Sequence, residues 1–110
     1  MNNVSRYSPR ALNDLYEIFD YIKYELKNAE AANNTINGIL LKVDNIRDFP
    51  EAGSILFFLD NIDSGYRYVR YKNYLAFYSI NQKNEIFVER ILYSGRDYMS
   101  LLMKKRVVNL

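Results

Sequence analysis

The side chains that most often carry chemistry near neutral pH are missing from this sequence. Its 110 residues include no Cys and no His. This composition excludes a thiolate nucleophile, a zinc site of the usual Cys/His kind, and imidazole as an acid or base. We expect neither a metal ion nor another cofactor. Any chemistry in this chain would depend on arginine, lysine, tyrosine and carboxylate side chains.

Positive charge is concentrated in the second half of the chain. Residues 66–106 contain nine Lys and Arg against three acidic residues, a net charge of +6, whereas residues 1–49 carry −1 and residues 50–65 carry −3. Such a distribution suggests a basic patch for a polyanion or an acidic partner. A merely solvated surface is the plainer interpretation, and charge alone favours it.

The basic residues of this half are interleaved with tyrosines. Guanidinium groups bind phosphates or carboxylates bidentately, and tyrosine rings can stack on bases. Strand alternation places Tyr66, Tyr68 and Arg70 on one face of a strand and Arg67 and Val69 on the other. In the last strand, alternation places four residues on one face and four on the other. The first set is Ile86, Val88, Arg90 and Leu92, and the second is Phe87, Glu89, Ile91 and Tyr93. Alternation does not decide which arginines face solvent. Composition alone favours a structural role for these arginines and tyrosines, because tyrosine is common in strands and arginine often extends across a sheet.

The first half of the chain is predicted to form two amphipathic helices, which would position the strands of the second half. Ser8 is a plausible N-cap, and Pro9 suits the first helical position. Apolar residues recur at helical spacing over residues 11–26 and, after a break at Asn28, over residues 29–49. The acidic residues expected on the other faces of the first helix are Asp14, Glu17 and Asp20. The residues expected to be buried are Leu15, Ile22, Ile36, Ile39, Val43 and Ile46.

The remaining elements are short. The sequence predicts strands at residues 2–7, 66–71, 74–80 and 85–92, an irregular connection at residues 55–64, and a final helix at residues 96–103. The order is β-α-α-β-β-β-α, an α+β fold in which an antiparallel sheet carries the N-terminal helical hairpin on one face. The length of the chain indicates a single domain over residues 1–110.

The chain shows no sign of membrane insertion or export. Its continuous apolar runs are too short to span a bilayer, and residues 1–6 are mostly polar and contain no apolar signal-peptide core. We therefore expect a cytoplasmic protein.

Two segments of the second half carry a family resemblance. An arginine, Arg67 or Arg70, precedes the pair Tyr74 and Tyr78, and a second strand leads to an Arg-Asp pair that begins at Arg96. In this order and spacing they resemble the toxins of the RelE/ParE superfamily, which are the toxin halves of bacterial type II toxin–antitoxin modules.

Two further segments extend the resemblance over residues 5–102. Residues 7–15 resemble the family's usual start of the first helix, and residues 49–53 resemble its Pro-x-x-Gly stop after the helical hairpin. One departure affects the chemistry, because this chain has Tyr93 where the family often has histidine. The resemblance implies a cognate antitoxin as partner and allows a toxin–antitoxin hetero-oligomer.

The superfamily contains two mechanisms. RelE-like members resemble ribosome-dependent endoribonucleases that cut mRNA, and that reaction needs a base, an acid and cations at the phosphate. The residues available for these roles are Arg70, Arg96, Tyr93, Tyr98 and Glu89. Tyrosine is a poor base at its ordinary pKa of about 10, and residues 55–66 lack the lysines that RelE-like relatives place there.

ParE-like members are similar to inhibitors of DNA gyrase, which bind a protein target and need no active site. The long helical hairpin suits this branch, and the resemblance therefore favours a gyrase inhibitor of the kind associated with plasmid stabilisation. The ribosome-dependent ribonuclease remains the alternative, and a plain binding module or inactive remnant is a third. The residues expected to bind the target or antitoxin are Arg67, Arg70, Arg90, Tyr93, Arg96, Lys104, Lys105 and Arg106.

Overall fold

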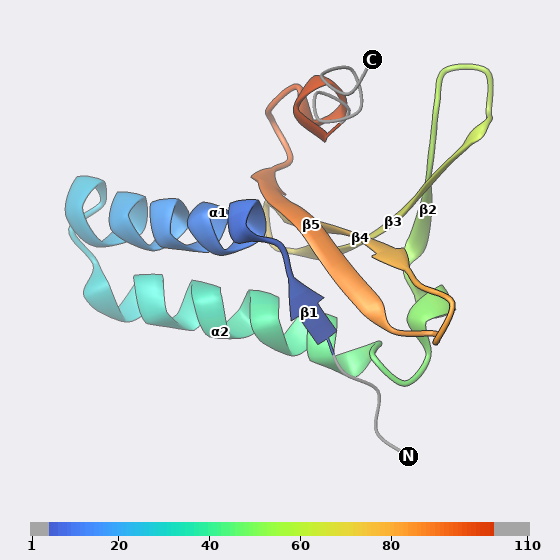
Figure 1. The fold of residues 1–110 in the computed structure, drawn as a ribbon. Helices are drawn as coiled ribbons and strands as arrows, with labels where there is room; N and C mark the ends of the chain where they lie inside the picture. The colour runs from blue at the N-terminus through green and yellow to red at the C-terminus, as the bar shows by residue number, and fades with distance from the viewer. Residues whose placement is uncertain (1–4, 103–110) are drawn as a thin grey trace.

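The computed structural model describes residues 5–102, and these residues form an α+β fold (Figure 1). The strands are β1 (Ser5–Tyr7), β2 (Ser54–Phe57), β3 (Asp63–Tyr71), β4 (Tyr74–Ile80) and β5 (Ile86–Tyr93). The helices are α1 (Pro9–Asp20), η1 (Tyr21–Glu25), α2 (Ala29–Asn45), the short η2 (Pro50–Ala52), and a last helix at residues 98–102. This arrangement confirms the predicted α+β class and the N-terminal helical hairpin. None of the helices within residues 5–102 is both long and apolar enough to cross a membrane.

The helical hairpin begins and turns where the sequence predicts. The Ser8 hydroxyl accepts a hydrogen bond of 2.9 Å from the Ala11 N–H, and Pro9 opens α1. The last turns of this helix widen into the π-helical η1, and Lys27 then adopts a left-handed backbone conformation with φ of 54°. Asn28 caps α2 through its side chain, which accepts from the Ala31 N–H at 2.9 Å. Capping therefore fixes the start of both helices.

The sheet has five strands in the order β1-β5-β4-β3-β2. Two of its pairings were not predicted. β1 lies parallel to β5, which makes the sheet mixed, and residues 54–57 form β2 beside β3, where an irregular connection was expected. Short links predict only hairpins between consecutive strands. The position of β1 depends instead on where the helical hairpin crosses the sheet, and β2 depends on the free edge that β3 offers.

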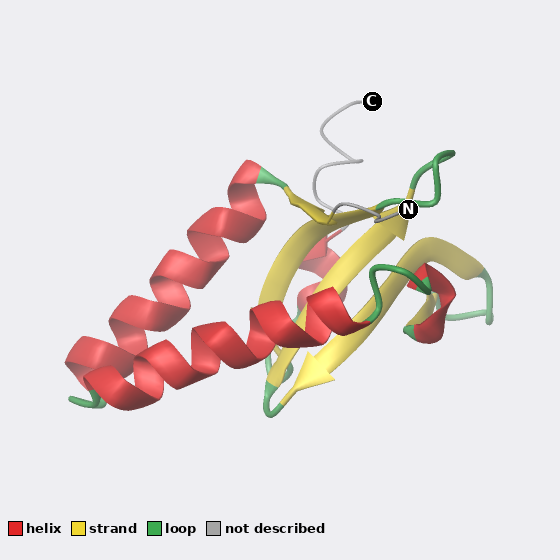
Figure 2. Ribbon diagram, turned by 90° about the horizontal axis from the view of Figure 1, so that it is seen from below, coloured by secondary structure: helices red, strands yellow, loops and turns green. Residues whose placement is uncertain are grey.

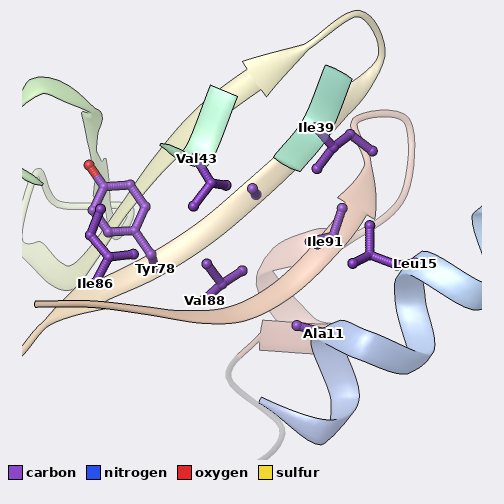
Figure 3. Packing of buried hydrophobic residues seen from close by; sticks show 9 residues of the cluster. Ala11, Leu15, Ile39, Val43, Tyr78, Ile86, Val88 and Ile91 are labelled. Atoms are coloured by element: carbon purple, nitrogen blue, oxygen red, sulfur yellow. The ribbon is translucent and has the colours of Figure 1, made fainter. Parts of the chain in front are cut away.

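One face of the sheet, the helix face, packs against α1 and α2 (Figure 2). Its core combines Leu15, Ile39 and Val43 of the helices with strand residues such as Tyr78 and Val88 (Figure 3). Of the six residues predicted to be buried, Leu15, Ile22, Ile39 and Val43 are buried, and Ile36 and Ile46 are partly buried against this core.

The opposite face, the far face, is also apolar. Its buried residues are Leu56, Tyr66, Leu75, Phe77, Leu92 and Leu102. The helix at residues 98–102 covers them, and the Tyr98 ring stacks on Phe77 with ring centroids 5.3 Å apart. This helix begins at residue 98, later than the predicted residue 96, because Arg96 lies in the preceding turn; residue 103 is outside the described residues.

A β-bulge changes the alternation of β5. Tyr78 pairs with Val88 and Phe77 pairs with Arg90, so that Glu89 is an extra residue inserted between the two paired positions. Beyond the bulge Ile91 belongs to the helix-face core, while Leu92 belongs to the far face. The predicted grouping of Val88 with Arg90 and Leu92 on one face is therefore wrong, because one inserted residue reverses every later side chain.

Candidate functional site

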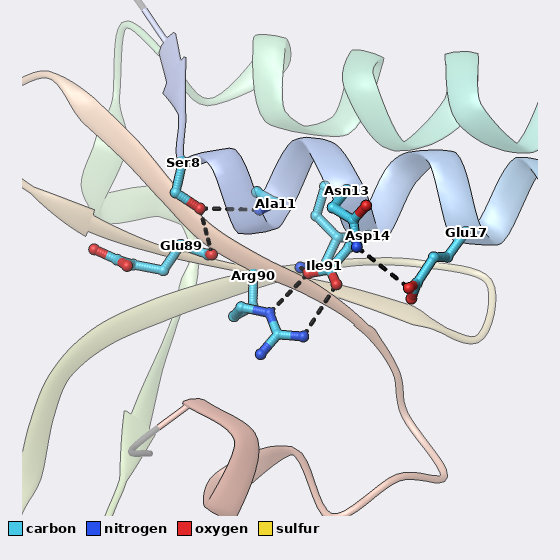
Figure 4. Close-up of polar contacts among 8 residues, drawn as sticks. All are labelled: Ser8, Ala11, Asn13, Asp14, Glu17, Glu89, Arg90 and Ile91. Carbon is cyan, nitrogen blue, oxygen red and sulfur yellow. Dashed lines mark hydrogen bonds and ion pairs between the residues drawn. The ribbon is translucent and has the colours of Figure 1, made fainter. Parts of the chain in front are cut away.

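The edge of β5 beyond β1 is bonded by side chains of the α1 segment (Figure 4). β1 pairs with β5 only as far as Val88. The Ser8 N–H then donates to the Val88 carbonyl at 2.9 Å, and the Ser8 hydroxyl donates to the Glu89 carbonyl at 2.7 Å. Further along, an Asp14 carboxylate oxygen accepts from the Ile91 N–H at 2.9 Å. These bonds satisfy an edge that would otherwise expose unpaired backbone groups.

Asp14 also holds Arg90. Its two carboxylate oxygens accept from the Arg90 Nε at 2.9 Å and from Nη2 at 3.0 Å. Asp14 is 5% exposed, and its hydrogen bond is the main cause that raises the pKa of Arg90. Arg90 was predicted to bind a target or antitoxin, but its guanidinium is engaged inside this chain. Such a bidentate pair is among the stronger polar contacts in proteins.

Sequence reasoning placed Asp14 on a polar face of the first helix, and that prediction is wrong. Asp14 is three residues after Ala11 and four before Ile18, so the helical period places it beside the buried stripe. A carboxylate at such a position needs a partner, because burial of an unpaired charge is costly. This spacing was a signal in the sequence that a buried ion pair would be present.

Arg67 also has an internal role. Its Nη1 donates to the carbonyls of Glu51 at 3.0 Å and Gly53 at 2.9 Å. In the strand beside it, the Tyr78 hydroxyl donates to the Pro50 carbonyl at 2.5 Å and accepts from the Gly53 N–H at 3.1 Å. Arg67 and Tyr78 together fix the segment at residues 50–53, which was recognised only as a family-like stop.

Of the other arginines named as candidates, Arg70 and Arg96 are exposed. Arg70 donates to the Lys72 carbonyl at 3.3 Å. Arg96 follows β5 and lines two neighbouring grooves, which also share Asp14 and Glu17. The positions of Lys104, Lys105 and Arg106 lie outside the described residues.

The first groove, the tyrosine groove, has a volume of about 480 Å³ and joins α1 and η1 to the end of β5. It is lined by Asp14, Glu17, Ile18, Tyr21, Tyr74, Ile91, Leu92, Tyr93 and Arg96. The rings of Tyr74 and Tyr93 meet edge to face, with centroids 6.1 Å apart. The structure thus brings Tyr93 and Arg96 together, and it adds Tyr21, which the sequence gave no reason to single out.

The second groove has a volume of about 490 Å³ and is more polar. Its basic lining residues are Arg10, Arg90 and Arg96, and Leu101 of the last helix also borders it. Because Arg90 is paired with Asp14, Arg10 and Arg96 are the cations that this groove offers to a partner. Within residues 5–102, no three acidic side chains lie close enough together to hold a metal ion.

Three tyrosines of the sheet have raised pKa values. Burial raises the pKa of Tyr7 to about 12, and burial is also the main cause that raises the pKa of Tyr74 and Tyr78. A raised pKa keeps a phenol protonated at neutral pH, where it donates a hydrogen bond and does not act as a base. Of the residues named for proton transfer, Tyr98 is stacked in the far-face core, and Glu89 is half-buried at the bulge.

The fold and this edge of the sheet define a small toxin-like α+β protein, and comparison with known proteins identifies its family. The family model described as the ParE toxin of the type II toxin–antitoxin system parDE matches residues 6–98. The chain therefore belongs to the ParE toxin family, within the RelE/ParE superfamily that the sequence resembled. A search of the curated proteins found no match.

Two solved structures share the fold. The chromosomal ParDE toxin–antitoxin system from P. aeruginosa has a chain that superposes with a TM-score of 0.68 at 19% identity, covering 83% of this chain and 95% of that chain. The RelBE2 toxin–antitoxin complex from Mycobacterium tuberculosis has a chain with a TM-score of 0.54 at 13% identity, covering 84% of this chain and 99% of that chain.

Proposed function

We propose that this toxin stops growth by binding DNA gyrase without an active site of its own, and that a cognate antitoxin neutralises it. The observation that carries the proposal is the far face, where Phe77 and Leu92 lie in an apolar core under the helix at residues 98–102. Cleavage of RNA requires cations and proton-transfer groups that converge on an open polar surface.

The state of the candidate catalytic residues supports the same proposal. Arg67 and Arg90, which could have added positive charge, are engaged by backbone carbonyls and by Asp14. Tyr98 packs on Phe77. Arg70, Arg96 and Tyr93 are exposed, and exposed arginines and tyrosines are also the residues most enriched in protein–protein interfaces.

The two mechanisms give opposite results with purified toxin. We expect inhibition of plasmid supercoiling by gyrase, and intact transcripts when the toxin is added to translating ribosomes and the mRNA is mapped by primer extension. Cleaved transcripts together with full gyrase activity would establish the ribonuclease instead. The toxin neutralised by its antitoxin is the control for both reactions.

The antitoxin is expected to present an acidic segment to the basic half of the toxin. The net charge of +6 over residues 66–106 provides the electrostatic attraction, and charge complementarity mainly accelerates association. Salt should therefore slow association and weaken binding, while the apolar part of the interface keeps the complex from dissociating. Calorimetry at two salt concentrations measures this, and absence of binding by the neighbouring gene's product would contradict the proposal.

The basic end of the chain is expected to contribute to target binding. Lys104, Lys105 and Arg106 supply three of the nine cations in the basic half. A chain truncated after Leu102 should be less toxic, and a full-length variant with these three residues changed to Ala separates the effect of charge from that of length. Full toxicity of both variants would confine the interface to residues before 103.

A further inference from the structure

The loop between β2 and β3 carries large apolar side chains into solvent. Leu59 is fully exposed, Ile62 is 58% exposed and Phe57 is 47% exposed; we call these three residues the apolar tip. In Figure 1 this loop projects beyond the sheet, on the opposite side of the molecule from the turn between α1 and α2. Large exposed apolar side chains within one short segment can mark an interaction site.

The loop is held by its own hydrogen bonds. The Phe58 N–H donates to the Ile62 carbonyl at 2.7 Å, and the Asn61 N–H donates to the Phe58 carbonyl at 3.0 Å. Asn61 has a φ of 59°, a left-handed conformation that asparagine tolerates better than most residues. A loop whose backbone is already ordered loses less conformational entropy when it binds a partner.

The base of the loop is also anchored. Leu56 and Tyr66, on either side of it, are buried in the far-face core. On the β3 side, the Gly65 N–H donates to the Asp63 carboxylate at 2.8 Å. The apolar tip therefore extends from a fixed support, and its exposure is a property of an ordered segment.

Charge indicates which kind of partner this tip suits. Residues 50–65 contain Glu51, Asp60 and Asp63 and no Lys or Arg. An acidic antitoxin segment would be repelled here and attracted to the basic half of the chain. The chemistry that complements the tip is an apolar pocket surrounded by lysine and arginine side chains.

We infer that the apolar tip anchors the toxin in an apolar, basic-rimmed pocket on the surface of its gyrase target. This inference rests on the proposed function. Central apolar side chains that fill a pocket are the residues on which an interface depends most. Leu59 then has the role of the central anchor, with Ile62 and Phe57 beside it and Asp60 at the rim.

The test compares Leu59→Ser with Leu41→Ser, because Leu41 is 61% exposed on α2, far from the loop in sequence. For each full-length toxin, gyrase affinity is measured by surface plasmon resonance, supercoiling inhibition by titration, antitoxin affinity by calorimetry and folding by circular dichroism. Leu59→Ser should raise the Kd for gyrase about tenfold or more. Antitoxin affinity and melting temperature should stay unchanged, and Leu41→Ser should match the wild type throughout.

A charge reversal tests the rim in the same way. Asp60→Lys should weaken gyrase binding, mainly through a slower association rate at low salt, whereas Asp48→Lys, an exposed acid after α2, should not.

The outcomes separate the two proposals. Wild-type toxin that leaves gyrase active overturns the proposed function and this inference together. Wild-type toxin that inhibits gyrase while Leu59→Ser is equally potent overturns only this inference. Loss of antitoxin affinity with gyrase inhibition intact would assign the tip to the antitoxin and would also overturn it.

Discussion

The two faces of the sheet are both apolar, but they are covered by very different amounts of structure. On the helix face, α1 and α2 contribute 12 and 17 residues. On the far face, the cover among residues 5–102 is the helix at residues 98–102. The first face is therefore a full core, while the second is a small core under a short helix. The difference leaves the far face with the thinner of the two covers.

The two grooves, with the exposed Arg10 and Arg96, lie where these two covers meet. Arg96 connects the tyrosine groove on the side of α1 with the groove that Leu101 of the last helix borders. A partner that binds here would contact both covers at once. The predictions that follow begin with the fully covered face and end with the exposed rim.

The largest effect is expected at the centre of the helix face. Val43 is completely buried in α2, and Val43→Asp would place an unpaired carboxylate in the core. The cost should exceed about 4 kcal/mol, which is enough to unfold a domain of this size. Leu41 lies two positions earlier in the same helix and is exposed. The Leu41→Asp protein should therefore still melt cooperatively by circular dichroism. A folded Val43→Asp protein would contradict the packing of α2 on the sheet.

The next effect concerns the bond that joins α1 to the edge of β5. Asp14→Ala leaves the Arg90 guanidinium and the Ile91 N–H without their partner and should destabilise by about 3–5 kcal/mol. Asp44→Ala breaks the exposed ion pair with Arg47, which measures 3.5 Å, and should cost less than about 1 kcal/mol. Urea unfolding of both variants measures the difference, and equal costs would mean that the buried pair contributes no more than a surface one.

A matched pair of truncations compares the two faces directly. Ile39→Ala on the helix face and Leu102→Ala on the far face each remove three carbon atoms from a side chain no more than 3% exposed. We expect about 4 kcal/mol for Ile39→Ala and about 2 kcal/mol for Leu102→Ala, because the short helix can move into the space and α2 cannot. If Leu102→Ala costs as much as Ile39→Ala in chemical denaturation, the far-face cover is as rigid as the helical hairpin.

The smallest effects are expected when single tyrosine hydroxyls are removed, first in the core and then at the surface. Tyr78→Phe leaves the Pro50 carbonyl and the Gly53 N–H unpaired in a buried place, at a cost of about 1–2 kcal/mol.

Tyr93→Phe removes an exposed hydroxyl and keeps the ring against Tyr74, so stability should change by less than about 0.5 kcal/mol. Gyrase inhibition by Tyr93→Phe should also be unchanged, and a folded but inactive Tyr93→Phe toxin would favour the ribonuclease.

Two residues of the tyrosine groove were named from the sequence, but the roles of the predicted residues could not be assigned from it. Arg96 and Tyr93 were predicted and do line a common groove. Arg67 and Arg90 were predicted on the same grounds, and they bind carbonyls and a carboxylate of their own chain. A sequence shows that an arginine is present in a strand, but whether it is free depends on which acceptors the fold brings within reach.

Local physical chemistry in the sequence determined the order of the elements, the start of both long helices at Ser8 and Asn28, and the apolar stripes that cover the sheet. These features depend on residues within one or two turns of each other. Tertiary structure alone decided the parallel pairing of β1, the bulge at Glu89 and the choice of Arg90 and the Ile91 N–H as the partners of Asp14. Each of these satisfies backbone groups at an edge of the sheet, and which edges need partners is set only once distant segments have come together.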